Sequence, residues 1–295
     1  MRAVEAIEFM AQGSGIIGLT RWLQTPAGRY LLGWEQAHLD AAVADIFGYH
    51  ALQLGLPELQ ALRSNRMPHR WVATESAQCL AQAAPVADES VRPVPVDRFA
   101  DTDPQPLPVA DVALRCDFDA LPFDAQSLDL VVLPHALELA RDPHLALREV
   151  ERVLVPEGRV VIVGFNPASL WGLRQRAAHL RRVPPGAPRR GFLPDSGEFI
   201  GYRRLRDWLR LLSFEVEAGR FGCYRPPVAS SRWLARFEWA ESVGERWWPV
   251  FGAVYFVVAV KRVRGMRLVG LARETRTVAR AAPAAVASRH DGGAR

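Results

Sequence analysis

Residue types that can do chemistry stand just after several short apolar runs of the kind that form β-strands. The stretch "ALQLGLPELQ" (51–60) reads as a strand ending at Gly55, followed by a turn and the start of a helix. Carboxyl groups follow two later runs, at Glu75 and Asp117, and an imidazole follows another, at His135. Carboxylates accept hydrogen bonds from hydroxyl and amino groups, and a histidine can take a proton from a nucleophile. Because ligands of open α/β sheets bind at the carboxyl ends of strands, these positions predict one ligand site.

The elements that would position these residues follow one another in α/β order. Strand patterns occur at residues 50–54, 69–73, 112–116, 128–133, 159–165, 214–222 and 253–262. The runs "LDLVVL" and "RVVIVGF" are apolar on both faces, as strands inside a parallel sheet require. Between these two runs, Asp142 can cap a helix that begins at Pro143. Strand, helix and strand in succession predict a right-handed βαβ unit.

Helical patterns flank these strands. Residues 1 to about 48 look helical and amphipathic. The clearest piece is "EQAHLDAAVADIF" (35–47), which has apolar residues at helical spacing and should pack one face on a core. Those apolar residues are Leu39, Val43, Ile46 and Phe47. A second helix is expected over "RLRDWLRLL" (204–212).

Residues 116–165 carry the most specific pattern, "CDFDALPFDAQSLDLVVLPHALELARDPHLALREVERVLVPEGRVVIVGF". An acidic residue follows the third strand, and "ALPF", a strand opening with Asp129, "HALE", "DP", "LREVERVL" and "PEG" come in that order. This order resembles the class I S-adenosylmethionine-dependent methyltransferases, particularly the methyltransferase type 11 group. The resemblance implies a doubly wound, Rossmann-like α/β fold. Its seven-stranded sheet would be mostly parallel with the last strand antiparallel.

The resemblance also implies a cofactor site for S-adenosylmethionine. Asp117 and the backbone N–H of Phe118 would bind the adenine edge, and Glu75 would bind the ribose hydroxyls. Glu75 stands 20 residues after Gly55, a distance typical of such folds. Aligning the helix that follows places Thr74 at the acid position instead. Asp117 could alternatively cap the next turn, and Glu75 could start a helix.

The loop after the first strand departs from the family pattern. Gln53 stands where the family has an acid, and Gly55 occupies the first glycine position, but Pro57 and Leu59 replace further glycines. S-adenosylmethionine has no phosphate, so the demand for glycine is weaker than in a phosphate-binding loop. Two readings stay open: methyl transfer to a small-molecule acceptor, or a non-catalytic binding or regulatory protein with this fold. In the first, His135 would be the general base, unless it packs against the cofactor.

Several segments interrupt the regular order. We expect a helical extension at 1–35 and a methyltransferase domain at 36–264, with a Pro-rich insertion at 85–108 and a short edge strand at 94–96. Residues 167–200, which mix arginine with aromatic residues, could form a lid over the site. In "GFNPASLWG", Asn166 is expected to be a turn residue. Five aromatic residues are expected to build a small satellite core, namely Trp233, Phe237, Trp239, Trp247 and Trp248.

Charge and cysteine content narrow the possible partners. Residues 261–295 contain nine Lys or Arg and two acidic residues, whereas the other 260 residues carry 28 basic and 30 acidic side chains. The basic tail, expected to be disordered from 265, would allow RNA as a second partner class. The three cysteines form no CxxC pair, so no metal site and no disulfide scaffold are expected. No apolar run is long enough to span a bilayer, and we expect a cytoplasmic protein of undetermined oligomeric state.

Overall fold

The computed structural model describes residues 18–75, 109–180, 191–194 and 199–262. These residues belong to one compact unit, Met1–Val263, and Arg264–Arg295 forms another. The expected insertion at 85–108, its edge strand and the tail from 265 lie outside the described residues.

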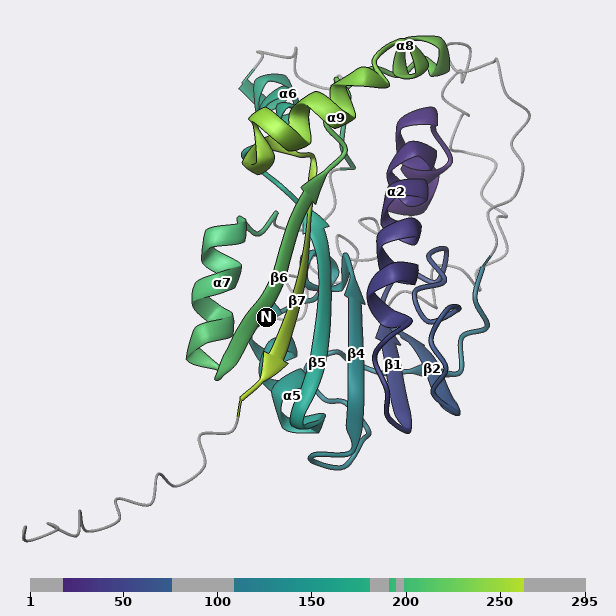
Figure 1. Cartoon of the computed structure of the whole chain (residues 1–295), viewed down its shortest axis with the longest axis vertical. Coiled ribbons are helices and arrows are strands. Elements are labelled where there is room, and N and C mark those ends of the chain that lie inside the picture. Colours follow the sequence, from purple (N-terminus) through teal and green to yellow (C-terminus); the bar gives the residue numbers. More distant parts are fainter. Residues whose placement is uncertain (1–17, 76–108, 181–190, 195–198, 263–295) are drawn as a thin grey trace, which may run out of the picture. The chain divides into compact units, whose positions relative to one another are not determined.

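A single sheet of seven strands forms the centre of the first unit (Figure 1). Its strands are β1 (His50–Leu54), β2 (His69–Thr74), β3 (Leu114–Arg115), β4 (Leu128–Pro134), β5 (Leu154–Phe165), β6 (Phe214–Gly222) and β7 (Val254–Lys261). The order across the sheet is β3-β2-β1-β4-β5-β7-β6. Strands β1 to β5 pair in parallel, and β7 is antiparallel to both of its neighbours. The predicted doubly wound, Rossmann-like α/β fold is confirmed.

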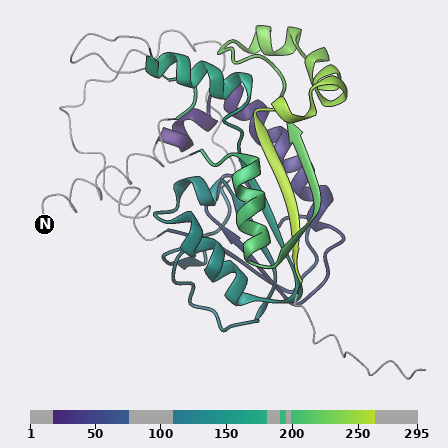
Figure 2. The same ribbon diagram turned by 90° about the vertical axis from the view of Figure 1, so that its left-hand side faces the viewer.

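Helices cover both faces of this sheet (Figures 1 and 2). They are α2 (Pro26–Val43), α4 (Ala136–Leu139), α5 (Pro143–Val153), α6 (Leu170–Leu180), α7 (Tyr202–Leu211), α8 (Ser231–Arg236) and α9 (Trp239–Trp247), with a 3-10 turn η1 (Pro249–Phe251). Helix α2 packs on one face, and α5 and α7 pack on the other. The sheet is therefore buried on both faces, as the continuous apolar runs of β4 and β5 require.

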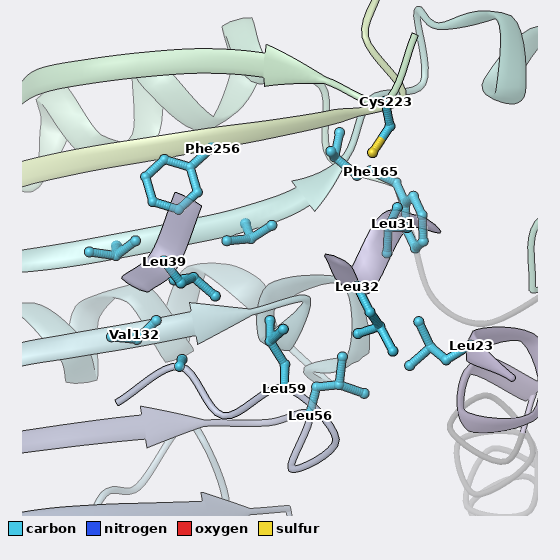
Figure 3. Packing of buried hydrophobic residues seen from close by; sticks show 14 of the residues in the cluster. Leu23, Leu31, Leu32, Leu39, Leu56, Leu59, Val132, Phe165, Cys223 and Phe256 are labelled. Carbon is cyan, nitrogen blue, oxygen red and sulfur yellow. The ribbon is translucent and has the colours of Figure 1, made fainter. Parts of the chain in front are cut away.

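Alternate residues of β5 pack into two separate hydrophobic cores. Val161 and Val163 join the cluster under α2, whereas Val160 and Ile162 join the cluster under α5 and α7. Figure 3 shows the first cluster, where Leu39 of α2 lies against the strands. This two-sided burial follows from the period of two along a strand.

Helix α5 begins where the sequence predicts. The Asp142 carboxylate accepts hydrogen bonds from the backbone N–H groups of His144 (2.8 Å) and Leu145 (3.1 Å), and Pro143 opens the helix. Two strand limits differ from the prediction by more than one residue. Strand β5 begins directly after α5 at Leu154 instead of 159, and β3 has only two residues.

Helix α2 corrects two expectations about the amino-terminal region. It runs unbroken from Pro26 to Val43, so the boundary placed between residues 35 and 36 falls inside one helix. Its end at Val43 also overturns the prediction that Phe47 packs on the core, because Phe47 lies beyond the helix and is 75% exposed. Ile46 is buried as expected.

Candidate functional site

The parallel register brings the predicted site residues to the carboxyl ends of adjacent strands. Leu54 pairs with Ala73, and Ala73 pairs with Leu114, so β1, β2 and β3 end at the same level. The N–H of Gly55 donates to the carbonyl of Ala73 (2.9 Å) just past the end of β1. Gly55, Glu75 and Asp117 thus follow the carboxyl ends of three adjacent strands. Ligands of open α/β sheets bind at the carboxyl ends of the strands.

Gly55 has the backbone conformation that its position demands. Its φ is +95°, which a side chain would strain. A Cβ at this position would lie 3.1 Å from the Cβ of Ala136 and 3.2 Å from the carbonyl oxygen of Pro134. Gly55 therefore allows close approach between the loop after β1 and the segment after β4.

The two predicted cofactor carboxylates both act electrostatically on the Cys116 thiol. Burial first, and then the nearby carboxylates of Asp117 and Glu75, raises the pKa of the Cys116 thiol to about 11. The Asp117 side chain is exposed. Phe118, the next residue, is buried. Thr74 is the last residue of β2 and Glu75 follows it, so the alternative register for the ribose-binding position stays open.

The side chain of Gln53 holds the loop after β1 in a fixed shape. Its Nε2 donates to the carbonyl oxygens of Leu56 (2.9 Å) and Leu59 (2.7 Å), and its Oε1 accepts from the N–H of Ala61 (3.0 Å). Gln53 is fully buried. The amide therefore binds the loop backbone itself and has no donor left for a ligand.

The helix expected after Gly55 does not form, and residues 55–68 contain only turns and bends. Gln53 occupies the carbonyls of Leu56 and Leu59 that a helix would need for its own backbone bonds. Leu56 and Leu59 instead enter the core beside Leu32 of α2 (Figure 3).

His135 lies at the centre of a buried ionic cluster. Its Nδ1 is 2.9 Å from Oε2 of Glu138, and its Nε2 is 2.8 Å from Oε1 of Glu35 on α2. Burial alone would lower the pKa of His135, but the two carboxylates outweigh it and raise the pKa to about 10. Both ring nitrogens of His135 face carboxylate oxygens, and this geometry favours the imidazolium form, which donates to Glu35 and Glu138. The general-base role considered from the sequence does not follow from this geometry, because no lone pair is free to take a proton.

The same cluster connects three elements of the fold. Glu138 uses its other oxygen, Oε1, to accept from the N–H of Phe165 at the end of β5. Glu35 belongs to α2, and its Oε2 is buried without a hydrogen-bond partner. Glu35, which stands 100 residues from His135, was not among the predicted site residues. A charged residue inside an otherwise apolar helical face was the available signal.

The described part of the region 167–200 is largely fixed to the core. Trp171 is buried, and its Nε1 donates to the carbonyl of Arg225 (2.7 Å). Phe192 and Phe199 pack partly buried against the cluster under α2. Asn166 is the expected turn residue, since its Oδ1 accepts from the N–H of Ala168 (3.0 Å). Whether this region closes over a ligand stays a prediction.

The expected satellite core does not exist. Trp233, Trp239, Trp247 and Trp248 are each more than half exposed, and only Phe237 among the five aromatic residues is partly covered. Within the described ranges, no group of three or more potential ligands could hold a metal ion. None of the described helices is long and apolar enough to cross a membrane.

Comparisons with known proteins match parts of this chain to methyltransferases. The methyltransferase domain model of the Methyltransf_11 family matches residues 98–162. The Escherichia coli (strain K12) protein YafS is 43% identical over 111 residues, which is 37% of this chain and 42% of YafS. A malonyl-[acyl-carrier protein] O-methyltransferase of Halorhodospira halophila is 45% identical over 63 residues, 20% of this chain and 21% of that protein. The demethylmenaquinone methyltransferase of Streptomyces griseus is 33% identical over 90 residues, 30% of this chain and 39% of its own length.

The chain therefore spans less than half the length of each of these relatives. Among solved structures, a chain of the complex between the Haloferax volcanii Trm112 methyltransferase activator and a methyltransferase superposes with a TM-score of 0.51. That match is 19% identical and covers 85% of this chain and 99% of the other. At this identity the match supports the fold. The chain therefore shares the seven-stranded α/β fold of this solved methyltransferase chain, and its residues 98–162 match the methyltransferase domain model.

Proposed function

We propose that this protein transfers a methyl group from S-adenosylmethionine to a small-molecule acceptor. The observation that carries the proposal is the arrangement at the carboxyl ends of β1, β2 and β3. There, Gly55 allows close approach of backbone, and Glu75 and Asp117 place two carboxylates around Cys116. No acceptor is identified by this arrangement.

The residues at this edge fit the nucleoside half of the cofactor. The exposed Asp117 carboxylate can accept from the adenine amino group, and the backbone N–H of Phe118 can donate to a ring nitrogen. Glu75, just past the end of β2, can accept from the ribose hydroxyls. The Gln53 amide is bound to its own loop, so the methionine half would rely on backbone groups of residues 54–59.

When bound, S-adenosylmethionine would supply an electrophilic sulfonium methyl group: the acceptor's nucleophile would bond to the methyl carbon in line as the carbon–sulfur bond breaks and S-adenosylhomocysteine leaves. The contribution of the chain is then to hold this group and the acceptor in the correct alignment. In this proposal His135 is a positioning residue: its ion pairs connect α2 to the segment that follows β4 and contacts Gly55. An acceptor that must lose a proton would need another base.

Thermal unfolding with and without S-adenosylmethionine tests the proposal. Ligand at about 100 times its dissociation constant should stabilise the folded protein by about 2.7 kcal/mol. We expect the Asp117→Ala variant to lose most of this shift, because it lacks the acceptor for the adenine amino group. The matched control is Asp111→Ala, which removes another exposed carboxylate from the same region and should keep the full shift.

Each outcome of this titration bears on one part of the proposal. Absence of any shift at about 1 mM ligand would contradict cofactor binding. An equal shift in wild type and Asp117→Ala would contradict the adenine assignment. A shift without methyl transfer to any of a broad panel of small acceptors would favour the non-catalytic alternative over the enzyme.

A further inference from the structure

The segment between β6 and β7 exposes an unusual number of large apolar side chains. Six of them are between 52% and 69% exposed, namely Trp233, Trp239, Trp247, Trp248, Val250 and Phe251. We call these six residues the aromatic surface. Soluble proteins rarely expose contiguous apolar patches of this kind unless they bind something there.

This exposure is imposed by a firmly anchored backbone. Leu234 of α8 is buried in the core under α2, and Gly244 of α9 packs directly on Tyr224. Glu241 of α9 accepts from the N–H groups of Cys223 (2.9 Å) and Tyr224 (3.1 Å) at the end of β6. With these faces of α8 and α9 turned inward, the tryptophans face outward.

The rings of α8 and α9 are also continuous with one another. Trp233 stacks on Phe237 with ring centroids 6.1 Å apart, and Phe237 lies 6.2 Å from Trp239. Arg236 lies 6.0 Å above the Trp233 ring. Phe237 therefore connects two rings of the aromatic surface, Trp233 and Trp239, and the Arg236 guanidinium lies beside them.

Helix α6 extends this apolar end of the domain. Its Leu170, Leu173 and Leu180 are each more than half exposed. Hydrogen bonds from Trp171 and Arg174 to the carbonyls of Arg225 and Pro227 connect α6 to the chain that enters α8. Figures 1 and 2 both place α6, α8 and α9 at the end of the sheet where β5 and β6 finish. Nine of the fifteen exposed large hydrophobics in the described ranges lie at this end.

The charge at this end is predominantly positive. Residues 170–180 and 231–251 expose five arginines, Arg174, Arg176, Arg232, Arg236 and Arg246. Only two glutamates, Glu238 and Glu245, are exposed in the same ranges. Tryptophan side chains with interspersed arginine are the residue types that bind the headgroup region of a bilayer, and excess positive charge favours anionic lipids.

We propose that the aromatic surface docks this domain onto a lipid bilayer that carries anionic headgroups. The rings would enter the headgroup region while the five arginines bind lipid phosphates. The candidate cofactor site lies at the same end of the strands, because β5 and β6 run parallel to β1–β4. Docking would turn these carboxyl ends of the strands toward the membrane. This inference does not depend on the methyl transfer proposed above.

Co-sedimentation of the full chain with lipid vesicles tests the proposal. We expect binding to phosphatidylcholine vesicles that contain about 30% phosphatidylglycerol, and little binding to pure phosphatidylcholine. Raising the sodium chloride concentration from about 0.05 M to about 0.5 M should weaken the binding, since salt screens the arginines. The Trp247→Ser/Trp248→Ser variant should lower the partition coefficient about tenfold or more.

The matched control replaces two equally exposed residues at the opposite ends of the strands. Phe47 and Leu211 are 75% and 82% exposed and precede the first residues of β1 and β6. The Phe47→Ser/Leu211→Ser variant should bind vesicles like wild type. Unchanged thermal unfolding would show that the tryptophan variant is folded, so its loss of binding is specific.

Four outcomes would overturn the proposal. They are no sedimentation of wild type with either vesicle, equal binding to both vesicle types, binding unaffected by salt, and equal loss in the two double variants. A wild-type dimer that dissociates in the Trp247→Ser/Trp248→Ser variant, without vesicle binding, would assign the aromatic surface to a second copy of the chain instead.

Discussion

Replacing His135 by asparagine is expected to lower the free energy of unfolding by about 3–5 kcal/mol near neutral pH. The substitution removes the only cation that faces the buried carboxylates of Glu35 and Glu138 in the described structure. Two uncompensated carboxyl groups would then stay in a buried site. Asparagine is chosen because it tolerates the left-handed conformation of His135, whose φ is 53°.

The pH dependence of this loss follows from the sign of the pKa shift. The pKa of His135 is 6.5 in the unfolded chain and is raised to about 10 in the fold. Its contribution to stability is therefore fully present below pH 6.5 and is lost as the pH rises toward 10. The difference between wild type and His135→Asn should be largest near pH 6–7 and should shrink toward pH 10. Urea unfolding at a series of pH values measures this difference.

An exposed histidine supplies the control. His144 is exposed on α5, and His144→Asn should change the free energy of unfolding by about 0.5 kcal/mol or less. If His135→Asn were equally mild, or if its effect did not change with pH, His135 could not be the cation that holds this cluster together.

The sheet could be predicted from the sequence because its strands and the helix between β4 and β5 have clear local patterns, and the fold follows these patterns. The apolar runs of β4 and β5, the Asp142 cap and the antiparallel β7 all appear at or near the expected residues. A parallel strand buried on both faces has few alternative structures. Helix α2 was less well predicted, since apolar spacing identifies a helix but not the residue at which it ends.

Residues of the candidate site could be located from the sequence only where they follow strand ends. Glu75 and Asp117 could be assigned to the carboxyl ends of the strands because each directly follows a predicted strand. Glu35 could not, because its contact with His135 depends on how α2 lies across the sheet. The tryptophans were misassigned for a related reason. Hydrophobic composition indicates an apolar surface, but only the packing of Leu234 and Gly244 decides which side faces inward.

Restoring the family's acid in the loop, Gln53→Glu, is expected to destabilise the fold by about 3–5 kcal/mol. The Nε2 group of Gln53 donates to the carbonyls of Leu56 and Leu59, and a carboxylate would instead face both carbonyl oxygens with negative charge. The position is fully buried, so water cannot relieve this repulsion. The change is nearly isosteric, and the loss therefore measures hydrogen bonding and charge more than packing.

The loss in Gln53→Glu should also grow with pH. Burial raises the pKa of a carboxyl group, so the folded variant would retain a proton that the unfolded chain releases at about pH 4.3. With the pKa raised in the folded state, stability declines as the pH increases above that value. The variant should be closest to wild type near pH 4–5 and furthest from it near pH 8.

Two comparisons separate charge from lost hydrogen bonds. Gln53→Met has a similar shape and no charge, so it should be destabilised without the added dependence on pH. Gln24→Glu, at an exposed position of the same chain, should change stability by about 0.5 kcal/mol or less. A Gln53→Glu protein as stable as wild type that binds S-adenosylmethionine more tightly would contradict this account. It would show that the side chain of residue 53 can give up its hydrogen bonds to the loop backbone and bind the cofactor as the family's acid does. If instead stability falls with the expected pH dependence, the glutamine is required by the turn structure that replaces the expected helix.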